Sequence, residues 1–328
     1  MLQPDDLAKL DRLAETALAC WDLPRVSHTH RINVSENTTY LVEGLDGYKA
    51  VLRLHRAGYH SRVAIISELA WIAALSSEAG IPTPRPISGR DGDPVQEMTL
   101  PDGERRYLVL FEFIDGRAPD EAGDLAPGFE ELGALAAQCH DHTQTWVPPT
   151  PFERLTWDLD AVFGRAATWG DWRAAPGLDG ELRPVLEMVE AKVRSRLGAY
   201  GAAPTRFNLI HADMRLANLI IGAGGTRLID FDDCGFGWLM YDFAAAISFM
   251  EDDPRVPALK SAWLRGYRKV RNLPTEDEAE IDTFIMLRRM ALLAWIGSHG
   301  HAPEAKALAS EFASRTAALG QSWLASAV

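Results

Sequence analysis

The stretch that decides the fold is His211-Ala-Asp213-Met-Arg215-Leu-Ala-Asn218-Leu-Ile-Ile221-Gly-Ala-Gly-Gly-Thr226-Arg-Leu228-Ile-Asp230-Phe-Asp232. Apolar runs at 219–221 and 228–229 flank a glycine-rich break, which predicts a β-hairpin. We expect a five-residue loop, 222–226, that sets Asn218 opposite Asp230 on one face of the hairpin. Asp213 then lies in the loop that enters the first strand.

These polar side chains match what phosphoryl transfer from a nucleotide requires. Mg²⁺ takes oxygen ligands, so Asn218 and Asp230 are predicted to hold it beside phosphate oxygens. A separate carboxylate, Asp213, would orient the attacking hydroxyl and accept its proton. The spacing His-x-Asp-x4-Asn alone also occurs in capped loops of unrelated enzymes. The strand–turn–strand that follows, with an aspartate twelve residues on, makes it specific.

The same stretch resembles the aminoglycoside phosphotransferase (APH) family of small-molecule kinases, which also includes choline kinases, type II homoserine kinases and the bacterial stress-response kinase A. Asp230-Phe-Asp stands where kinases have Asp-Phe-Gly. The resemblance implies structural roles for His211 and for Asp242, which would brace the catalytic loop. It also places Arg215 where protein kinases carry a lysine that contacts the transferred phosphoryl group.

The fold implied is an α+β, protein-kinase-like fold with two lobes. Residues 1–113 would form the nucleotide-binding N-lobe, an antiparallel sheet with one key helix and an additional N-terminal helix. Residues 114–328 would form a mainly helical C-lobe that carries the catalytic loop and the acceptor site. Helices are expected at 129–145, 182–197, 240–250, 257–271, 276–299 and 305–323.

An ion pair is predicted inside the N-lobe. Arg53 ends the strand at 48–54, where kinases of this fold have a lysine, and a helix is expected at 62–79. Glu68 falls on the apolar face of that helix, and a carboxylate on a buried face needs a partner. We expect Arg53 to be that partner, so that the pair orders the donor phosphates.

The nucleotide is expected to contact two further segments. The loop that contains Ser35 and Asn37 would cover its phosphates, although it lacks the Gly-x-Gly-x-x-Gly of protein kinases. Backbone groups around Glu112 and Phe113, at the end of the last N-lobe strand, would hold the adenine edge.

Candidate acceptor residues come from aromatic and acidic segments. Trp157 and Asp158 are the most plausible substrate contacts in an aromatic region that otherwise reads as core. Asp232, Asp233 and residues 251–253 form acidic runs that either surround a cleft and attract an amine or simply cap turns and helices. The histidines at 140 and 142 are not expected to bind metal.

Composition narrows the class of protein. The formal net charge of −13 argues against a nucleic-acid or anionic-membrane surface. Three cysteines without CxxC spacing suggest neither a zinc site nor a disulfide framework. No apolar run reaches transmembrane length, and the N-terminus lacks the pattern of a signal peptide. A cytoplasmic location is therefore expected.

The sequence thus favours a kinase that uses ATP or GTP with Mg²⁺ to phosphorylate an alcohol. We expect a small hydroxylated metabolite as acceptor, such as an amino alcohol, a homoserine-like molecule or an aminoglycoside. A protein Ser/Thr kinase resembling stress-response kinase A is the alternative, and a nucleotide-binding module without catalysis is a third. Neither the acceptor nor the oligomeric state can be predicted from the sequence.

Overall fold

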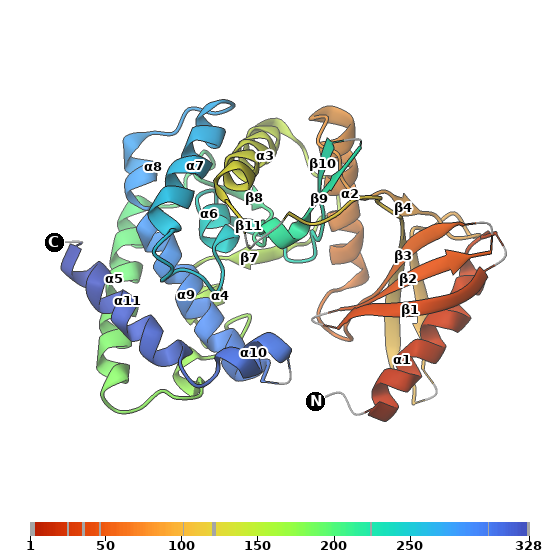
Figure 1. Cartoon of the computed structure of the whole chain (residues 1–328), viewed down its shortest axis with the longest axis horizontal. Coiled ribbons are helices and arrows are strands. Elements are labelled where there is room, and N and C mark those ends of the chain that lie inside the picture. Colours follow the sequence, from red (N-terminus) through yellow and green to blue (C-terminus); the bar gives the residue numbers. More distant parts are fainter. Residues whose placement is uncertain are drawn as a thin grey trace. The chain divides into compact units, whose positions relative to one another are not determined.

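The computed structural model describes residues 4–24, 26–34, 37–45, 47–100, 102–119, 123–223, 225–300 and 302–326 (Figure 1). The chain divides into two compact units, and neither is one continuous segment. Unit 1 comprises Met1–Arg117, Pro148–Arg154 and Ile220–Asp232. Unit 2 comprises Ala118–Val147, Leu155–Leu219 and Asp233–Val328. The sequence predicted one boundary after residue 113, whereas unit 1 also takes up two later segments.

Unit 1 is built on an antiparallel sheet. In its described residues six strands pair in the order β1-β2-β3-β6-β4, and β5 pairs with β6. The strands are β1 (Val26–Val34), β2 (Thr38–Gly44), β3 (Lys49–Leu54), β4 (Pro86–Ile87), β5 (Val95–Thr99) and β6 (Arg105–Glu112), and the helices are α1 (Pro4–Ala17) and α2 (Arg62–Glu78).

The two faces of this sheet have different partners because side chains alternate along a strand. Leu52 and Leu110 lie on the face that forms a core with α1, together with Tyr40 and Val42. Arg53 lies on the opposite face of β3 and reaches α2. The sheet therefore buries an apolar face under α1 and presents a charged group to α2.

The glycine-rich hairpin is present, but its predicted loop is wrong. The strands are β9 (Leu219–Gly222) and β10 (Gly225–Leu228), which pair with each other. The connection between the two strands is two residues long rather than five. Residues 225–227 pair with β9 although their side chains are not apolar. Asn218 ends a short 3-10 helix and Asp230 follows β10, so neither belongs to a strand and the predicted cross-strand pairing is wrong.

Unit 2 is mainly helical around a small sheet in which β7 and β8 flank β11. None of the helices in the described part of the chain is long and apolar enough to cross a membrane. The elements are α3 (Ala126–Thr145), β7 (Leu155–Trp157), α4 (Leu159–Phe163), α5 (Leu182–Tyr200), β8 (Phe207–Ile210), β11 (Gly235–Trp238), α6 (Tyr241–Ala246), α7 (Val256–Arg268), α8 (Thr275–Ala279), α9 (Ile281–Ser298), α10 (Pro303–Leu308) and α11 (Phe312–Ser326).

Three expected helices are shorter or divided. The segment 276–299 is split at Glu280, whose carboxylate accepts from Thr283 Oγ1 at the start of α9 and pairs with Arg196 of α5. The segment 305–323 is split into α10 and α11 before Phe312, which packs on Phe249. The segment 240–250 contains only α6, because the backbone turns into the left-handed region at Phe249 (φ 70°).

The closest helix packing in unit 2 joins α3 to α7. A Cβ atom on Gly266 of α7 would clash with the Glu130 carbonyl oxygen, and one on Gly133 of α3 would clash with that of Trp263. Both glycines thus allow the two backbones to approach closely. This contact supports α3, which supplies His140 to the site described next.

Candidate functional site

The loop that follows β8 is held by one buried carboxylate. Asp242 accepts hydrogen bonds from the backbone N–H of His211 at 3.3 Å and from that of Ala212 at 2.7 Å. Ala212 has a φ of 64°, a conformation that costs free energy for a residue with a side chain. Two bonds to one fully buried carboxylate hold the loop in that conformation, which is the contact expected of Asp242.

Asp242 is itself oriented by α3 and α7. His140 Nε2 lies 2.9 Å from Asp242 Oδ2, and its Nδ1 lies 3.0 Å from the hydroxyl of Tyr267. His140 is fully buried. The sequence analysis gave this histidine no role. The available signal was its position four residues after Ala136 on the buried face of α3.

Asp213 is surrounded by donors from unit 2. Asn218 Nδ2 donates to its carboxylate at 2.9 Å and to its carbonyl at 2.7 Å. Arg215 Nε lies 3.2 Å from Oδ1, and Arg288 Nη2 lies 3.1 Å from the same oxygen. Burial by itself raises the pKa of Asp213, but the charges of Arg215 and Arg288 outweigh it and hold that pKa below its usual range.

Arg288 is the main residue that the sequence analysis missed. It comes from α9 and is buried, and it donates to Ser248 Oγ at 3.0 Å and to the Ala212 carbonyl at 3.3 Å. Its guanidinium also stands 4.9 Å from the ring centre of Trp169. Two adjacent arginines in the middle of an otherwise apolar helical run were the signal, because a buried cation needs a specific partner.

The side chain of Asn218 presents an oxygen. Its Nδ2 is used by Asp213, which fixes the orientation of the amide, and among the described residues no hydrogen bond reaches its Oδ1. An amide oxygen held in this way is a suitable ligand for a hard cation such as Mg²⁺. The fixed amide oxygen of Asn218 therefore fits its predicted role as a metal ligand.

Asp230 is followed by two buried residues of unit 1. Phe231 packs edge-on against Trp71 with ring centres 5.5 Å apart, and Asp232 is also buried. Asp230 itself is exposed and has a φ of 62°. The segment therefore turns one carboxylate outward, as a metal-binding role requires.

The predicted pair of Arg53 and Glu68 is present. Arg53 Nη2 donates to Glu68 Oε1 at 2.7 Å, and both side chains are buried. Arg53 also stands over the ring of Phe111, 5.1 Å from its centre. The cation is thus fixed by α2 and by β6 at the end of β3.

Asp232, which we predicted to contact the substrate, is buried. It lies beside two histidines and an arginine, with Oδ1 3.7 Å from His55 Nδ1 and 3.9 Å from Arg53 Nη1, and Oδ2 3.5 Å from His60 Nε2. Arg154 also donates to its backbone carbonyl. Burial alone raises the pKa of Asp232, yet the nearby His60 and Arg53 lower it far more. Asp232 therefore anchors the segment that follows Asp230, with two histidines that the sequence analysis did not identify.

Trp157 and Asp158, the predicted substrate contacts, both make structural interactions. Trp157 is fully buried, stacks on Tyr241 and donates its indole N–H to the Asp233 carbonyl at 2.8 Å. Asp158 caps α4, where its Oδ1 accepts from the backbone N–H of Asp160 and of Ala161. Both residues use their functional groups for structure.

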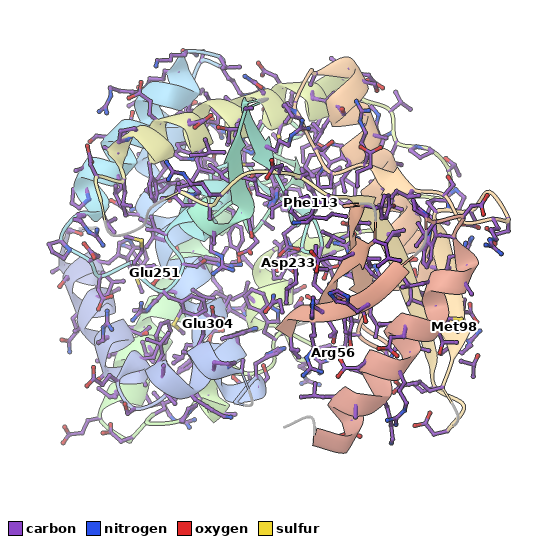
Figure 2. The ribbon with its side chains drawn as sticks, turned by 45° about the vertical axis from the view of Figure 1, so that its right-hand side comes forward. Arg56, Met98, Phe113, Asp233, Glu251 and Glu304 are labelled. Carbon is purple, nitrogen blue, oxygen red and sulfur yellow. The ribbon has the colours of Figure 1, made fainter. Side chains whose placement is uncertain are left out.

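The acidic segment 251–253 is already paired with arginines. Glu251 lies 2.6 Å from Arg289, and both side chains are fully buried. Asp252 pairs with Arg315 and Asp253 with Arg255. Figure 2 shows Glu251 apart from Asp233. The expected acidic cluster around a cleft is therefore absent from these residues, and Asp233 is the remaining candidate from that set.

The nucleotide-binding segments give a mixed result. Ser35 lies outside the described residues. Asn37 is buried and its Oδ1 accepts from the Arg56 backbone N–H at 3.2 Å. The Glu112 N–H donates to the Arg85 carbonyl at 2.9 Å, so this donor is not open to an adenine edge. Phe113, labelled in Figure 2, is exposed, and Lys49 Nζ lies 5.3 Å from its ring centre.

Comparison with known proteins adds the family context. The model of the APH phosphotransferase enzyme family matches residues 29–278. The structure of a microcompartment-associated aminopropanol kinase is 39% identical, with a TM-score of 0.89, over 96% of this chain and 98% of that chain. An amicoumacin kinase solved in complex with AMP-PNP, Ca²⁺ and Ami shares the fold, with a TM-score of 0.77 and 20% identity over 96% of each chain.

Curated relatives include the homoserine kinase of Pseudomonas aeruginosa strain PAO1. It is 28% identical over 237 residues, which is 71% of this chain and 68% of that protein. The chain spans 64% to 73% of the length of the curated relatives it matches.

Proposed function

Because the chain belongs to the APH phosphotransferase enzyme family, we propose that it transfers the γ-phosphoryl group of ATP to the hydroxyl of a small amino alcohol. The arrangement around Asp213 carries this proposal. A carboxylate held by an asparagine and two arginines, on a loop braced by a buried aspartate, has the position and the charge state that orientation of an attacking hydroxyl needs.

Asp213 orients the hydroxyl rather than acting as a strong base. Its lowered pKa keeps it ionised at neutral pH and makes it a weak proton acceptor. That suits a loose transition state, in which the proton leaves late. Arg215, whose side chain is 30% exposed, is proposed to stabilise the charge on the transferred group.

Asn218 and Asp230 are proposed to hold Mg²⁺, which supplies neutralising charge to the phosphates when it is bound. The fixed amide of Asn218 and the outward carboxylate of Asp230 support this role. Arg53, held by Glu68, would order the donor phosphates in unit 1. Ser35, Asn37 and the backbone near Phe113 remain proposed nucleotide contacts.

The proposed acceptor class no longer depends on an acidic cluster. It is supported by the similarity to the aminopropanol kinase and by Asp233, whose charge acts on Arg288 as that of Asp213 does. A carboxylate that shares a cation with the proposed catalytic aspartate is suited to pair with an ammonium group. The small-molecule kinases found by comparison do not favour the alternative of a protein kinase.

The test is a screen of ATP consumption with simple amino alcohols, homoserine, choline, an aminoglycoside and a generic protein substrate. We expect turnover with amino alcohols that lack a carboxylate. Homoserine turnover alone would overturn the acceptor class while preserving the kinase. Phosphorylation of protein hydroxyls only would reject a small-molecule acceptor.

Two variants separate binding from chemistry. Asp213→Asn should retain Mg²⁺-dependent ATP binding and lose turnover, whereas Asp230→Asn should lose that binding. Calorimetric titration of ATP with and without Mg²⁺ measures the difference. Equal ATP binding by Asp230→Asn and by the unmodified protein would show that Asp230 is not a metal ligand.

A further inference from the structure

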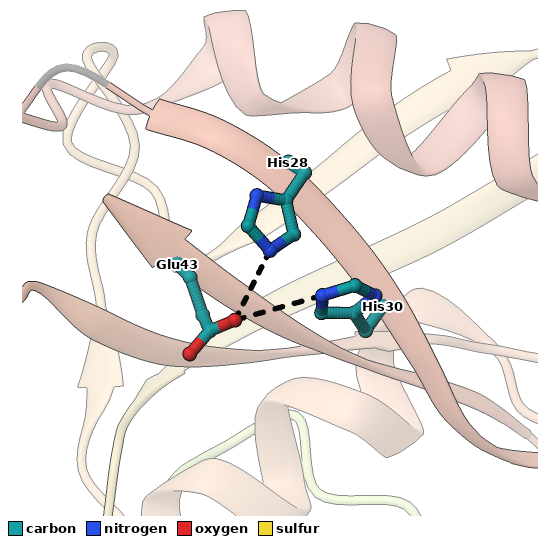
Figure 3. Close-up of side chains that lie close together, drawn as sticks. All are labelled: His28, His30 and Glu43. Atoms are coloured by element: carbon teal, nitrogen blue, oxygen red, sulfur yellow. Dashed lines mark hydrogen bonds and ion pairs between the residues drawn. The ribbon is translucent and has the colours of Figure 1, made fainter. Parts of the chain in front are cut away.

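A cluster of two histidines and a glutamate lies on the first two strands of unit 1 (Figure 3). His28 and His30 come from β1, and Glu43 comes from β2. Their ligand atoms all lie within 4.8 Å of one another. Among the residues that the structure describes, this is the group of histidine, cysteine and acidic side chains that meets the spacing of a metal site.

The strand register explains why the three side chains meet. His28 is paired with Glu43 across the two strands, and His30 is two residues further along β1. Residues two apart in a strand share a face, so both imidazoles reach the same carboxylate. Val42, next to Glu43, points the other way into the core. The cluster therefore occupies the face of β1 and β2 that is turned away from that core.

The distances suit one bound ion. His28 Nε2 lies 3.1 Å and His30 Nε2 3.6 Å from Glu43 Oε2. With metal–ligand bonds of about 2.0–2.2 Å, ligand atoms on a tetrahedral zinc ion are about 3.3–3.6 Å apart. The two histidine–glutamate separations are close to this range, and the two imidazole nitrogens lie within 4.8 Å of each other.

The second oxygen of Glu43 has another partner. Lys49 of β3 is paired with Glu43 in the sheet, and its Nζ lies 3.8 Å from Oε1. This contact leaves Oε2 directed at the two histidines. It favours coordination through one oxygen, with the lysine as an outer partner that orients the ligand.

We propose that His28, His30 and Glu43 form a site for a divalent transition metal, with Zn²⁺ as the ion of choice. Two imidazoles and one carboxylate suit Zn²⁺, Ni²⁺ or Cu²⁺, whereas Mg²⁺ takes oxygen ligands and is excluded by this donor set. Three protein ligands leave one position for water or for a further ligand. The half-exposed imidazoles make the site exchangeable with solvent.

A bound ion would also join two strands. In the described sheet β1 pairs with β2 alone, and their register is irregular between Val26 and His28 and again between Arg31 and Asn33. A metal held by both strands would suppress opening of this edge. The proposal therefore predicts slower amide exchange across β1 when Zn²⁺ is present.

The experiment is titration of the metal-free full chain, without a polyhistidine tag, with Zn²⁺ at about pH 8, where imidazole is ordinarily neutral. We expect one Zn²⁺ per chain, lost in the His28→Gln/His30→Gln double variant and weakened at least tenfold in each single variant. Co²⁺ should give the visible bands of a tetrahedral site in the unmodified protein and not in the double variant. Lys49→Met is the matched control, and it should retain one bound ion.

Two results would overturn the proposal. One is the absence of stoichiometric Zn²⁺ binding by the unmodified chain. The other is binding that the double variant retains in full. Circular dichroism of the double variant should match that of the unmodified chain, because both imidazoles are exposed. Amide exchange of residues 26–34 with and without Zn²⁺ gives an independent readout.

Discussion

Arg288 Nη2 lies 3.1 Å from Asp213 Oδ1, although 75 residues separate the two in the chain. The same guanidinium donates to the carbonyl of Ala212, the residue before Asp213. Arg288 therefore fixes both the side chain and the backbone of the proposed catalytic loop. It also contributes, with Arg215, to the lowered pKa of Asp213.

Arg288→Met should lower kcat by about 10²-fold, because a small displacement of a positioned group is costly to catalysis. The variant should also raise the pKa of Asp213, since a neighbouring cation is lost. An ionised carboxylate is needed for turnover, so the acidic limb of the pH–rate profile should move to higher pH. Arg289→Met, on the same helix but paired with Glu251, should reduce stability without moving that limb. This role of Arg288 would be contradicted if the acidic limb of Arg288→Met stayed at the same pH and its turnover remained within a few-fold of that of the unmodified enzyme.

Arg53 and Glu68 should behave as one unit in catalysis. Glu68→Gln removes the charge that holds Arg53 at 2.7 Å, and Arg53→Met removes the proposed phosphate contact. If Glu68 acts only through Arg53, the double variant should lose about as much activity as Arg53→Met alone. Steady-state kinetics with varied ATP measure this. Strictly additive losses would show that the two residues act separately.

His55 should make the protein less stable in mild acid. Burial, and then the charge of Arg53, holds the pKa of His55 well below its ordinary value. The folded chain therefore keeps it neutral, while the unfolded chain takes up a proton as the pH falls through the ordinary histidine range. Stability should decrease from about pH 7 to pH 5, by at most about 1.4 kcal/mol per pH unit for this one proton.

Urea unfolding at several pH values checks this expectation. Between pH 5 and pH 7, His55→Gln should reduce the slope of unfolding free energy against pH, by an amount that corresponds to at most one bound proton. The lowered pKa of Asp232 adds a separate loss of stability in stronger acid, which begins where free carboxyls titrate and continues below that range. Identical slopes for the two proteins between pH 5 and pH 7 would show that His55 is protonated in the folded state.

The contact of α3 with α7 should not tolerate a methyl group. Gly266→Ala places a Cβ atom against the Glu130 carbonyl, so we expect a loss of about 1–3 kcal/mol in unfolding free energy. Gly198 in α5 is a matched control, because nothing lies within 4 Å of its added Cβ. Gly198→Ala should be neutral or stabilising by up to about 1 kcal/mol. Equal stability of the two variants would refute the close packing.

Local pattern was enough to predict much of this protein. Apolar periodicity and turn residues located the main helices and strands, and the spacing of Asp213, Asn218 and Asp230 indicated the family. The pairing of Arg53 with Glu68 was also predictable, because a carboxylate on an apolar helix face requires a cation nearby. These inferences depend on short stretches in which the residue types and their periodicity determine which side chains are buried.

Partners distant in sequence were decided by the tertiary structure alone. Nothing near Asp213 indicates that Arg288 contacts it, and nothing near Asp242 indicates His140. Asp232 and Glu251 belong to acidic runs that were expected at a cleft or at caps, yet each is buried beside an arginine from another element. The physical reason is that a charged group's effect depends on the groups packed around it. Which groups those are is determined only when separate helices and strands come together.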